Sequence, residues 1–275
     1  MRLFYLVLSL ILLLFCSHII AQGTAGPSAP ARPAPADTIR PGKKGLVTSY
    51  LKPGLRQYLL IYQNPKSDRA LGFWYWLRDI HKETRQGKDV FIITQNWYGS
   101  DSNAYRTVYS INTAEDFIPL YHKELVRGKL SAFDWKPSEI KAADSVAGIA
   151  NKDFSIALAE PTYNWNLDIE TFEMLPLAEG RSFVINFYDA GISAPKYVRY
   201  EVSGSEKIGL PEGQLTDCWK LSSTDTTKGT TYSETYWISK KDHQFLKEED
   251  HFNGMIRYKI KVTPGMPDLR LNFAR

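Results

Sequence analysis

The strongest constraint on the fold is a repeated pattern of short apolar runs that end in turn residues. The runs are rich in β-branched and aromatic residues, and Gly, Pro, Asn or Asp follow most of them. Connections this short cannot make parallel crossovers, so consecutive strands must pair as antiparallel hairpins. The strands that we predict are 57–63, 70–85, 89–98, 105–111, 116–126, 129–135, 181–189, 197–208, 217–225, 230–240, 244–252 and 255–262.

The last hairpin has the clearest signals. Asn253-Gly254 is a dipeptide typical of a two-residue hairpin turn, because both residues tolerate positive φ. The strand that follows alternates, since Ile256 and Tyr258 share one face and Arg257 and Lys259 share the other.

One segment, 166–175, has helical rather than strand spacing. Asn166 is a capping residue and Pro176 ends the helix. Four apolar residues at spacings of three and four lie on one helical face: Trp165, Ile169, Phe172 and Leu175. The fold class that follows is mainly β: one large curved antiparallel sheet, a half-open β-barrel, with one packed α-helix.

The N-terminal part has two segments of different character. Residues 1–21 read as a signal peptide, with a positive start at Arg2, an apolar core and small Ala21 at its end. Residues 22–45 are rich in Pro and Ala without apolar periodicity, so we expect a disordered linker. Residues 46–275 are expected to form a single antiparallel β domain.

The predicted signal implies export, with the periplasm as destination and no integral membrane span after cleavage. An uncleaved membrane anchor is the alternative, because Leu3–Ile20 approaches the roughly 20 apolar residues that a spanning helix needs. A lipid on Cys16 is disfavoured, since bulky Phe15 stands where a small residue is required.

Composition excludes several classes of function. The net charge is +4, or +3 once Arg2 is removed with the signal, and no run of Lys and Arg stands out, so nucleic-acid binding is not indicated. Cys218 would then be the one cysteine left, which excludes an intrachain disulfide. Stability must come from a core, for which a hydrophobic fraction of 43% is ample.

The motifs of common catalytic and metal sites are missing from the sequence. It contains no Gly-x-Ser-x-Gly elbow and no glycine-rich phosphate loop between a strand and a helix. His243 and His251 flank the acidic run Glu248–Asp250, but they lie too far apart along a strand to share an ion. A solvated edge strand explains this charged run better. We therefore predict no catalytic residues, no metal and no cofactor.

Aromatic residues are the positive signal. Phe73, Trp74, Tyr75 and Trp76 follow one another, so this strand carries bulk on both faces and is expected to be covered on both. Aromatic residues suit the core of a large sheet, but they can also line an apolar cavity between the sheet and the helix. The candidate cavity-lining residues are Trp74, Trp76, Trp97, Trp135, Trp219 and Trp237.

Two C-terminal segments resemble a family of exported bacterial proteins of unknown function. The matching positions are Glu201, Val202, Gly204 and Glu206 in one predicted strand, and Trp237, Ile238, Ser239 and Asp242 at the end of another. That family is similar in layout to the lipoprotein carriers LolA and LolB, which are open β-barrels closed by helices around an apolar cavity. The resemblance implies lipid or acylated cargo and a structural role for the motifs.

The function expected from the sequence is non-enzymatic: an exported envelope protein that binds or carries a lipid-like or other hydrophobic ligand. A structural or adaptor protein of the envelope, with an unknown protein partner, is the first alternative. An uncharacterised hydrolase is the second, and a group of side chains with shifted pKa in one cleft would favour it.

Overall fold

The structure is a computed structural model that describes residues 35–66, 70–99, 105–210, 213, 215–227 and 229–262. The chain divides into two units, Met1–Pro33 and Ala34–Arg275, and the described residues belong to the second. The predicted signal peptide and the first part of the predicted linker therefore lie outside the described residues.

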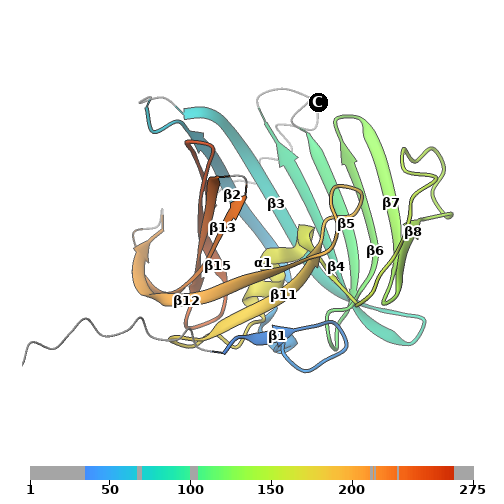
Figure 1. The fold of residues 1–275 in the computed structure, drawn as a ribbon, viewed down its shortest axis with the longest axis horizontal. Coiled ribbons are helices and arrows are strands. Elements are labelled where there is room, and N and C mark those ends of the chain that lie inside the picture. Colours follow the sequence, from blue (N-terminus) through green and yellow to red (C-terminus); the bar gives the residue numbers. More distant parts are fainter. Residues whose placement is uncertain are drawn as a thin grey trace, which may run out of the picture. The chain divides into compact units, whose positions relative to one another are not determined.

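Sixteen strands of the described chain form one large, open, curved sheet (Figure 1). They are β1 (Asp37–Ile39), β2 (Gly54–Gln63), β3 (Ala70–Arg85), β4 (Lys88–Tyr98), β5 (Arg106–Thr113), β6 (Pro119–Val126), β7 (Lys129–Lys136), β8 (Glu139–Ala142), β9 (Ser155–Ala157), β10 (Tyr163–Asn164), β11 (Ser182–Tyr188), β12 (Lys196–Gly209), β13 (Leu215–Thr227), β14 (Thr230–Ser239), β15 (Phe245–Phe252) and β16 (Met255–Val262). All twelve predicted strands are present, and the sequence missed only the short β1, β8, β9 and β10.

The sheet follows the chain order in two runs that meet in its middle. Its order is β1-β11-β12-β13-β14-β15-β16-β2-β3-β4-β5-β6-β7-β8-β9, with β10 also paired to β11. All pairings are antiparallel except those of β1 and β10 with β11. The predicted Asn253-Gly254 turn joins β15 to β16, and both residues have positive φ, 49° and 73°. Short strands at both ends of this order limit edge pairing with other chains.

Strand β1 corrects the predicted extent of the linker. The sequence predicts disorder up to residue 45, but Asp37–Ile39 pairs in parallel with β11. The Ile39 side chain is buried in the main core, with 2% of its surface exposed. Backbone pairing and one buried side chain thus order a segment whose composition alone favours disorder.

The predicted helix is present but shorter. A 3₁₀ turn, Trp165–Leu167, leads into α1 (Asp168–Glu173), which lies against the inner face of the sheet (Figure 1). The predicted cap Asn166 does not cap α1: Asn164 caps the 3₁₀ turn by accepting a hydrogen bond from the Asn166 backbone N–H, and Leu167 at the N-cap of α1 makes no side-chain cap. In the described ranges, no helix is long and apolar enough to cross a membrane.

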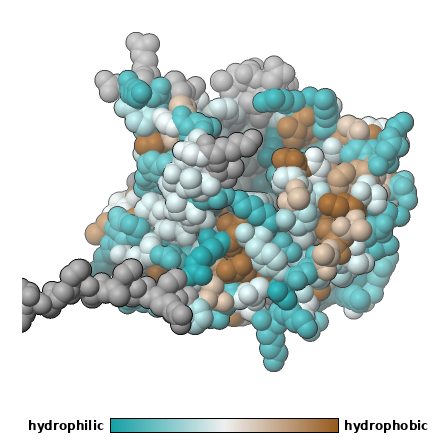
Figure 2. Space-filling view, in the orientation of Figure 1, coloured by the Kyte–Doolittle hydropathy of each residue, from teal (hydrophilic) through white to brown (hydrophobic). Residues whose placement is uncertain are grey.

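The main core lies between α1 and the inner face of the sheet. The ring of Phe172 on α1 lies 4.7 Å from those of both Tyr200 and Tyr236, which come from β12 and β14. A second cluster, which includes Phe133 and Trp135, forms around β7 and β8. On the face of the molecule shown in Figure 2, the hydrophobic residues on the right-hand side are interspersed with hydrophilic ones.

The four consecutive aromatics of β3 divide between the two faces. Trp76 packs in the main core, with Trp74 against it half-buried, whereas Tyr75 belongs to a small cluster on the other face. Phe73 is 52% exposed. The prediction of cover on both faces therefore holds for Tyr75 and Trp76 but is wrong at Phe73.

Candidate functional site

The candidate site is a cavity of about 290 Å³ on the inner face of the sheet. Its walls come from β3, β4, β5, β14 and β16, from the 3₁₀ turn and the first residue of α1, and from Asp189, which follows β11. Ligand sites usually have roughly 300–1,000 Å³, so this one suits a small molecule.

Three tryptophans form an aromatic wall of the cavity. Trp76 and Trp97 are directly opposite each other on β3 and β4, and their rings lie 4.7 Å apart. Trp165, which precedes α1, stacks on Phe187 of β11 at 5.6 Å. The cavity therefore offers flat apolar surfaces to a ligand.

Only two of the six candidate tryptophans, Trp76 and Trp97, line this cavity. The other four lie elsewhere: Trp74 against Tyr62, Trp135 in the second core cluster, Trp219 under Lys240, and Trp237 in a small cluster with Cys218 and Leu246. Trp165 was not among the predicted cavity residues, because its spacing placed it on the apolar face of the predicted helix. In the structure Trp165 lies in the 3₁₀ turn before α1.

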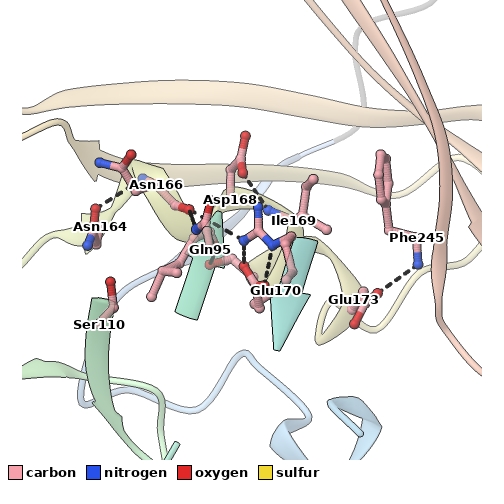
Figure 3. A network of polar contacts seen from close by, with 12 residues as sticks. Gln95, Ser110, Asn164, Asn166, Asp168, Ile169, Glu170, Glu173 and Phe245 are labelled. Carbon is pink, nitrogen blue, oxygen red and sulfur yellow. Dashed lines mark hydrogen bonds and ion pairs between the residues drawn. The ribbon is translucent and has the colours of Figure 1, made fainter. Parts of the chain in front are cut away.

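Two arginines of the cavity are held by carboxylates on the α1 side and on β6. Arg78 donates to Glu170 through Nε (2.7 Å) and also through Nη2, and both side chains are almost fully buried. Arg106 donates to Glu124 at 2.9 Å and also to the Asn166 side chain. Figure 3 shows Glu170 and Asn166 reaching into this polar network from the α1 side.

The other two cations of the cavity lie on β16. Arg257 and Lys259 are directly opposite Asp250 and Glu248 of β15, and each pair forms an ion pair. Both carboxylates have no exposed surface. The prediction of a solvated edge strand is therefore wrong: β15 lies between β14 and β16, and its Glu248 and Asp250 are buried beside cationic partners on β16.

The buried Glu248 and Asp250 carboxyls differ in charge state. Burial raises the pKa of Asp250 to about 9, and the neighbouring Glu248 adds to this shift. Burial acts on Glu248 too, but Lys259 and Arg257 outweigh it and hold the pKa of Glu248 below its usual value. The pair therefore carries one proton, which resides on Asp250, and Glu248 is ionised.

Three further carboxyl groups line the cavity: Asp168, Asp189 and Glu234. They accept hydrogen bonds from the Ile169 backbone (2.7 Å), the Asn166 amide (3.2 Å) and the Tyr232 hydroxyl (2.5 Å), respectively. Burial is the largest cause that raises the pKa of each, for Asp189 to about 6. Within the described ranges, none of the three forms an ion pair.

A serine and a histidine meet nearby, but in a buried position. Ser110 Oγ lies 2.9 Å and Asn164 Nδ2 3.0 Å from Nδ1 of His122, which therefore accepts. Burial and Arg106 lower the pKa of His122 to about 3. Ser110 and His122 are 0% and 1% exposed, so no substrate can reach this hydroxyl in the structure. The arrangement holds strands β5 and β6 together with Asn164.

The two histidines that the sequence singled out lie apart. His243 stacks on Tyr50 with ring centroids 3.9 Å apart, and His251 hydrogen-bonds Glu249 at 2.9 Å. Among the described residues, no group of three or more His, Cys, Asp or Glu side chains could hold a metal ion.

Comparison with known families gives one match. The profile of a family described as "Protein of unknown function (DUF3108)" matches residues 68–264, which is most of the chain. The chain belongs to the DUF3108 family. All residues that line the cavity, from Trp76 to Lys259, lie within the DUF3108 match. No curated protein matches the chain.

The two segments on which the resemblance rested contact each other in this DUF3108 protein. Trp237 Nε1 donates to Glu206 at 3.0 Å, which joins β14 to β12 across β13. Gly204 lies at a bulge of β12 with φ +138°, a conformation open almost only to glycine. None of these three residues lines the cavity.

Proposed function

We propose that this DUF3108 protein is a non-enzymatic binding protein that takes up a small amphipathic ligand in the inner cavity. The observation that carries the proposal is the composition of the walls, where the indoles of Trp76, Trp97 and Trp165 face charged and amide side chains. A ligand with one apolar face and several polar groups fits both kinds of wall.

The size and polarity of the cavity limit which ligands fit. An apolar cavity of about 150 Å³ holds benzene, so about 290 Å³ admits one ring with its substituents. Nine of the thirteen lining side chains are charged or carry an amide. The proposal therefore favours a smaller and more polar ligand than the lipid-like one expected from the sequence.

The N-terminal sequence supports export, which we include in the proposal. Sequencing of the mature N-terminus tests it: we expect the chain to begin at Gln22 in the periplasmic fraction. Recovery of full-length chain in the membrane fraction would favour the anchored alternative.

The binding proposal is tested on protein purified from its native envelope. Organic extraction and mass spectrometry should identify a bound compound at a fixed stoichiometry. Its readdition should change tryptophan fluorescence, because three indoles line the cavity. The same titration is then run on two single variants at half-buried tryptophans, Trp97→Ala inside the cavity and Trp219→Ala outside it.

We expect the dissociation constant to be at least tenfold larger for Trp97→Ala and unchanged for Trp219→Ala. Equal effects of the two substitutions would place binding elsewhere. Absence of any extracted compound, together with no binder in a screen of small amphipathic molecules, would refute the proposal.

One observation favours the hydrolase alternative. Asp168, Asp189 and Glu234 bring carboxyls with raised pKa into one cavity, and such groups can act as general acids or bases. Chromogenic glycosides and esters test it. Turnover that Glu234→Gln abolishes in a folded protein would replace the binding proposal, and no turnover of the whole panel would leave binding as the function.

A further inference from the structure

We propose that the ligand of the inner cavity is an organic cation, a molecule with an ammonium or guanidinium group on a ring-sized apolar body. This inference rests on the proposed binding function and names the chemical class of the ligand. It follows from the balance of charge around the cavity.

Each cation of the cavity already has a carboxyl partner within the protein. Arg78 is paired with Glu170, and Arg106 with Glu124. On the opposite side, Glu248 and Asp250 hold the two cations of β16. Each of the four cationic side chains thus has a carboxyl group of the protein as its direct partner, so none is left free for an anionic ligand.

Three lining carboxyls remain without a cationic partner. Asp168, Asp189 and Glu234 accept hydrogen bonds only from a backbone N–H, an amide and a phenol, respectively. Within the described ranges none of them has a Lys, Arg or His nitrogen within 4.0 Å. Carboxylates taken out of water are stabilised by an opposite charge. Arg78, Arg106 and Lys259 act on these three carboxyls only from beyond 4.0 Å, so a direct cationic partner would come from the ligand.

The cavity favours an organic cation over a metal ion. The described His, Cys, Asp and Glu side chains nowhere form a group of three that could hold a metal. The aromatic wall suits a cation on an apolar body instead, because indole faces attract cations. Arg78 lies 4.5 Å over Trp76 and Arg106 lies 5.7 Å over Trp97. Trp165, by contrast, carries no Lys or Arg of the described chain over its ring, so it is the indole left for the ligand.

The experiment compares three probes of one shape and different charge: benzylamine, benzyl alcohol and benzoate. Each is titrated into the purified mature protein at pH 7.5 by calorimetry, and Trp97→Ala reports whether binding occurs in the cavity. We expect benzylamine to bind at least tenfold more tightly than benzyl alcohol, and benzoate not to bind. Affinity for benzylamine should fall between pH 7.5 and pH 5, as protonation removes the negative charge of Asp189, a group that Glu124, Asp168 and Arg106 face.

Two variants test the residues, and a surface variant serves as control. Asp189→Asn and Glu234→Gln should weaken benzylamine at least fivefold and leave benzyl alcohol unchanged. Asp225→Asn on β13, where the Asp225 side chain is 43% exposed, should change neither. Circular dichroism of each variant checks the fold, and the benzyl alcohol titration shows that the cavity is intact.

The outcomes separate the two proposals. Benzyl alcohol or benzoate that binds as tightly as benzylamine, with dependence on Trp97, would overturn the cationic ligand and leave the binding function standing. Displacement of benzylamine by Ca²⁺ alone would also overturn it, in favour of a metal. No binding of any probe, together with no extracted compound, would overturn both.

Discussion

The buried ion pair between Arg78 of β3 and Glu170 of α1 should be a major determinant of how the helix is held on the sheet. Both side chains are almost fully buried, at 2% and 0% exposure. Arg78 donates twice to Glu170 and, at 3.4 Å, to the Asn166 carbonyl. Replacing either partner alone leaves the other as an unpaired charge away from water.

The size of the effect follows from these contacts. Hydrogen bonds to charged groups are worth about 1.5–3 kcal/mol each, so the two between Arg78 and Glu170 amount to about 3–6 kcal/mol. Removing one member of a buried pair costs about 3–5 kcal/mol by a separate estimate. We therefore expect Arg78→Met and Glu170→Met each to lower the free energy of unfolding by about 3–5 kcal/mol.

The double variant should lose less than either single variant, because two methionines leave no unpaired charge. Urea unfolding followed by circular dichroism measures all four proteins, and with a slope of about 3 kcal/mol per M each single variant shifts the midpoint by about 1 M or more. The matched control is the exposed pair Lys196 and Asp225, where replacing either residue with methionine should lower the free energy of unfolding by less than about 1 kcal/mol. Losses that add fully in the Arg78 and Glu170 double variant would refute the reasoning.

Two further predictions concern stability. Burial and Arg106 lower the pKa of His122 to about 3, against about 6.5 in the unfolded chain. Between these two pH values the unfolded state binds more protons than the folded state. The free energy of unfolding should therefore fall as the pH drops from 6.5 towards 3, by up to about 1.4 kcal/mol per pH unit. His122→Asn, which keeps an acceptor near Nδ1, should remove that slope from urea midpoints, and an unchanged slope would assign it to other groups. Gly204→Ala should cost about 1–3 kcal/mol through its positive φ alone, since an added Cβ meets no atom within 4 Å. Gly209→Ala in the same strand, whose φ lies outside that region, is the control for this substitution, and an equal loss there would contradict the argument.

The local features of the fold could be predicted from the sequence because they depend on neighbours along the chain. Strand β3 has the predicted bounds, 70–85, since turn residues flank its apolar run. The Asn253-Gly254 turn forms because both residues tolerate positive φ. These signals act within a few residues, so they need no knowledge of distant contacts.

The candidate site was only partly predictable. The choice of tryptophans as candidates correctly identified Trp76 and Trp97 as cavity residues, but the other four candidates lie outside the cavity. A missed signal was a charge within a strand: Arg78 directly follows the apolar run that ends at Leu77, and it is 1% exposed. Such a residue needs a buried partner, and its partner, Glu170, is 92 positions away along the chain.

Strand β16 shows most directly where the sequence stops being sufficient. Its alternation determined that Ile256 and Tyr258 share one face and that Arg257 and Lys259 share the other. Hydrophobicity alone would turn the first pair inward, yet Lys259 is buried and the first pair is half-buried. The tertiary structure decided this orientation, because Glu248 of β15 lies directly opposite Lys259 and each buried charge needs the other as its partner.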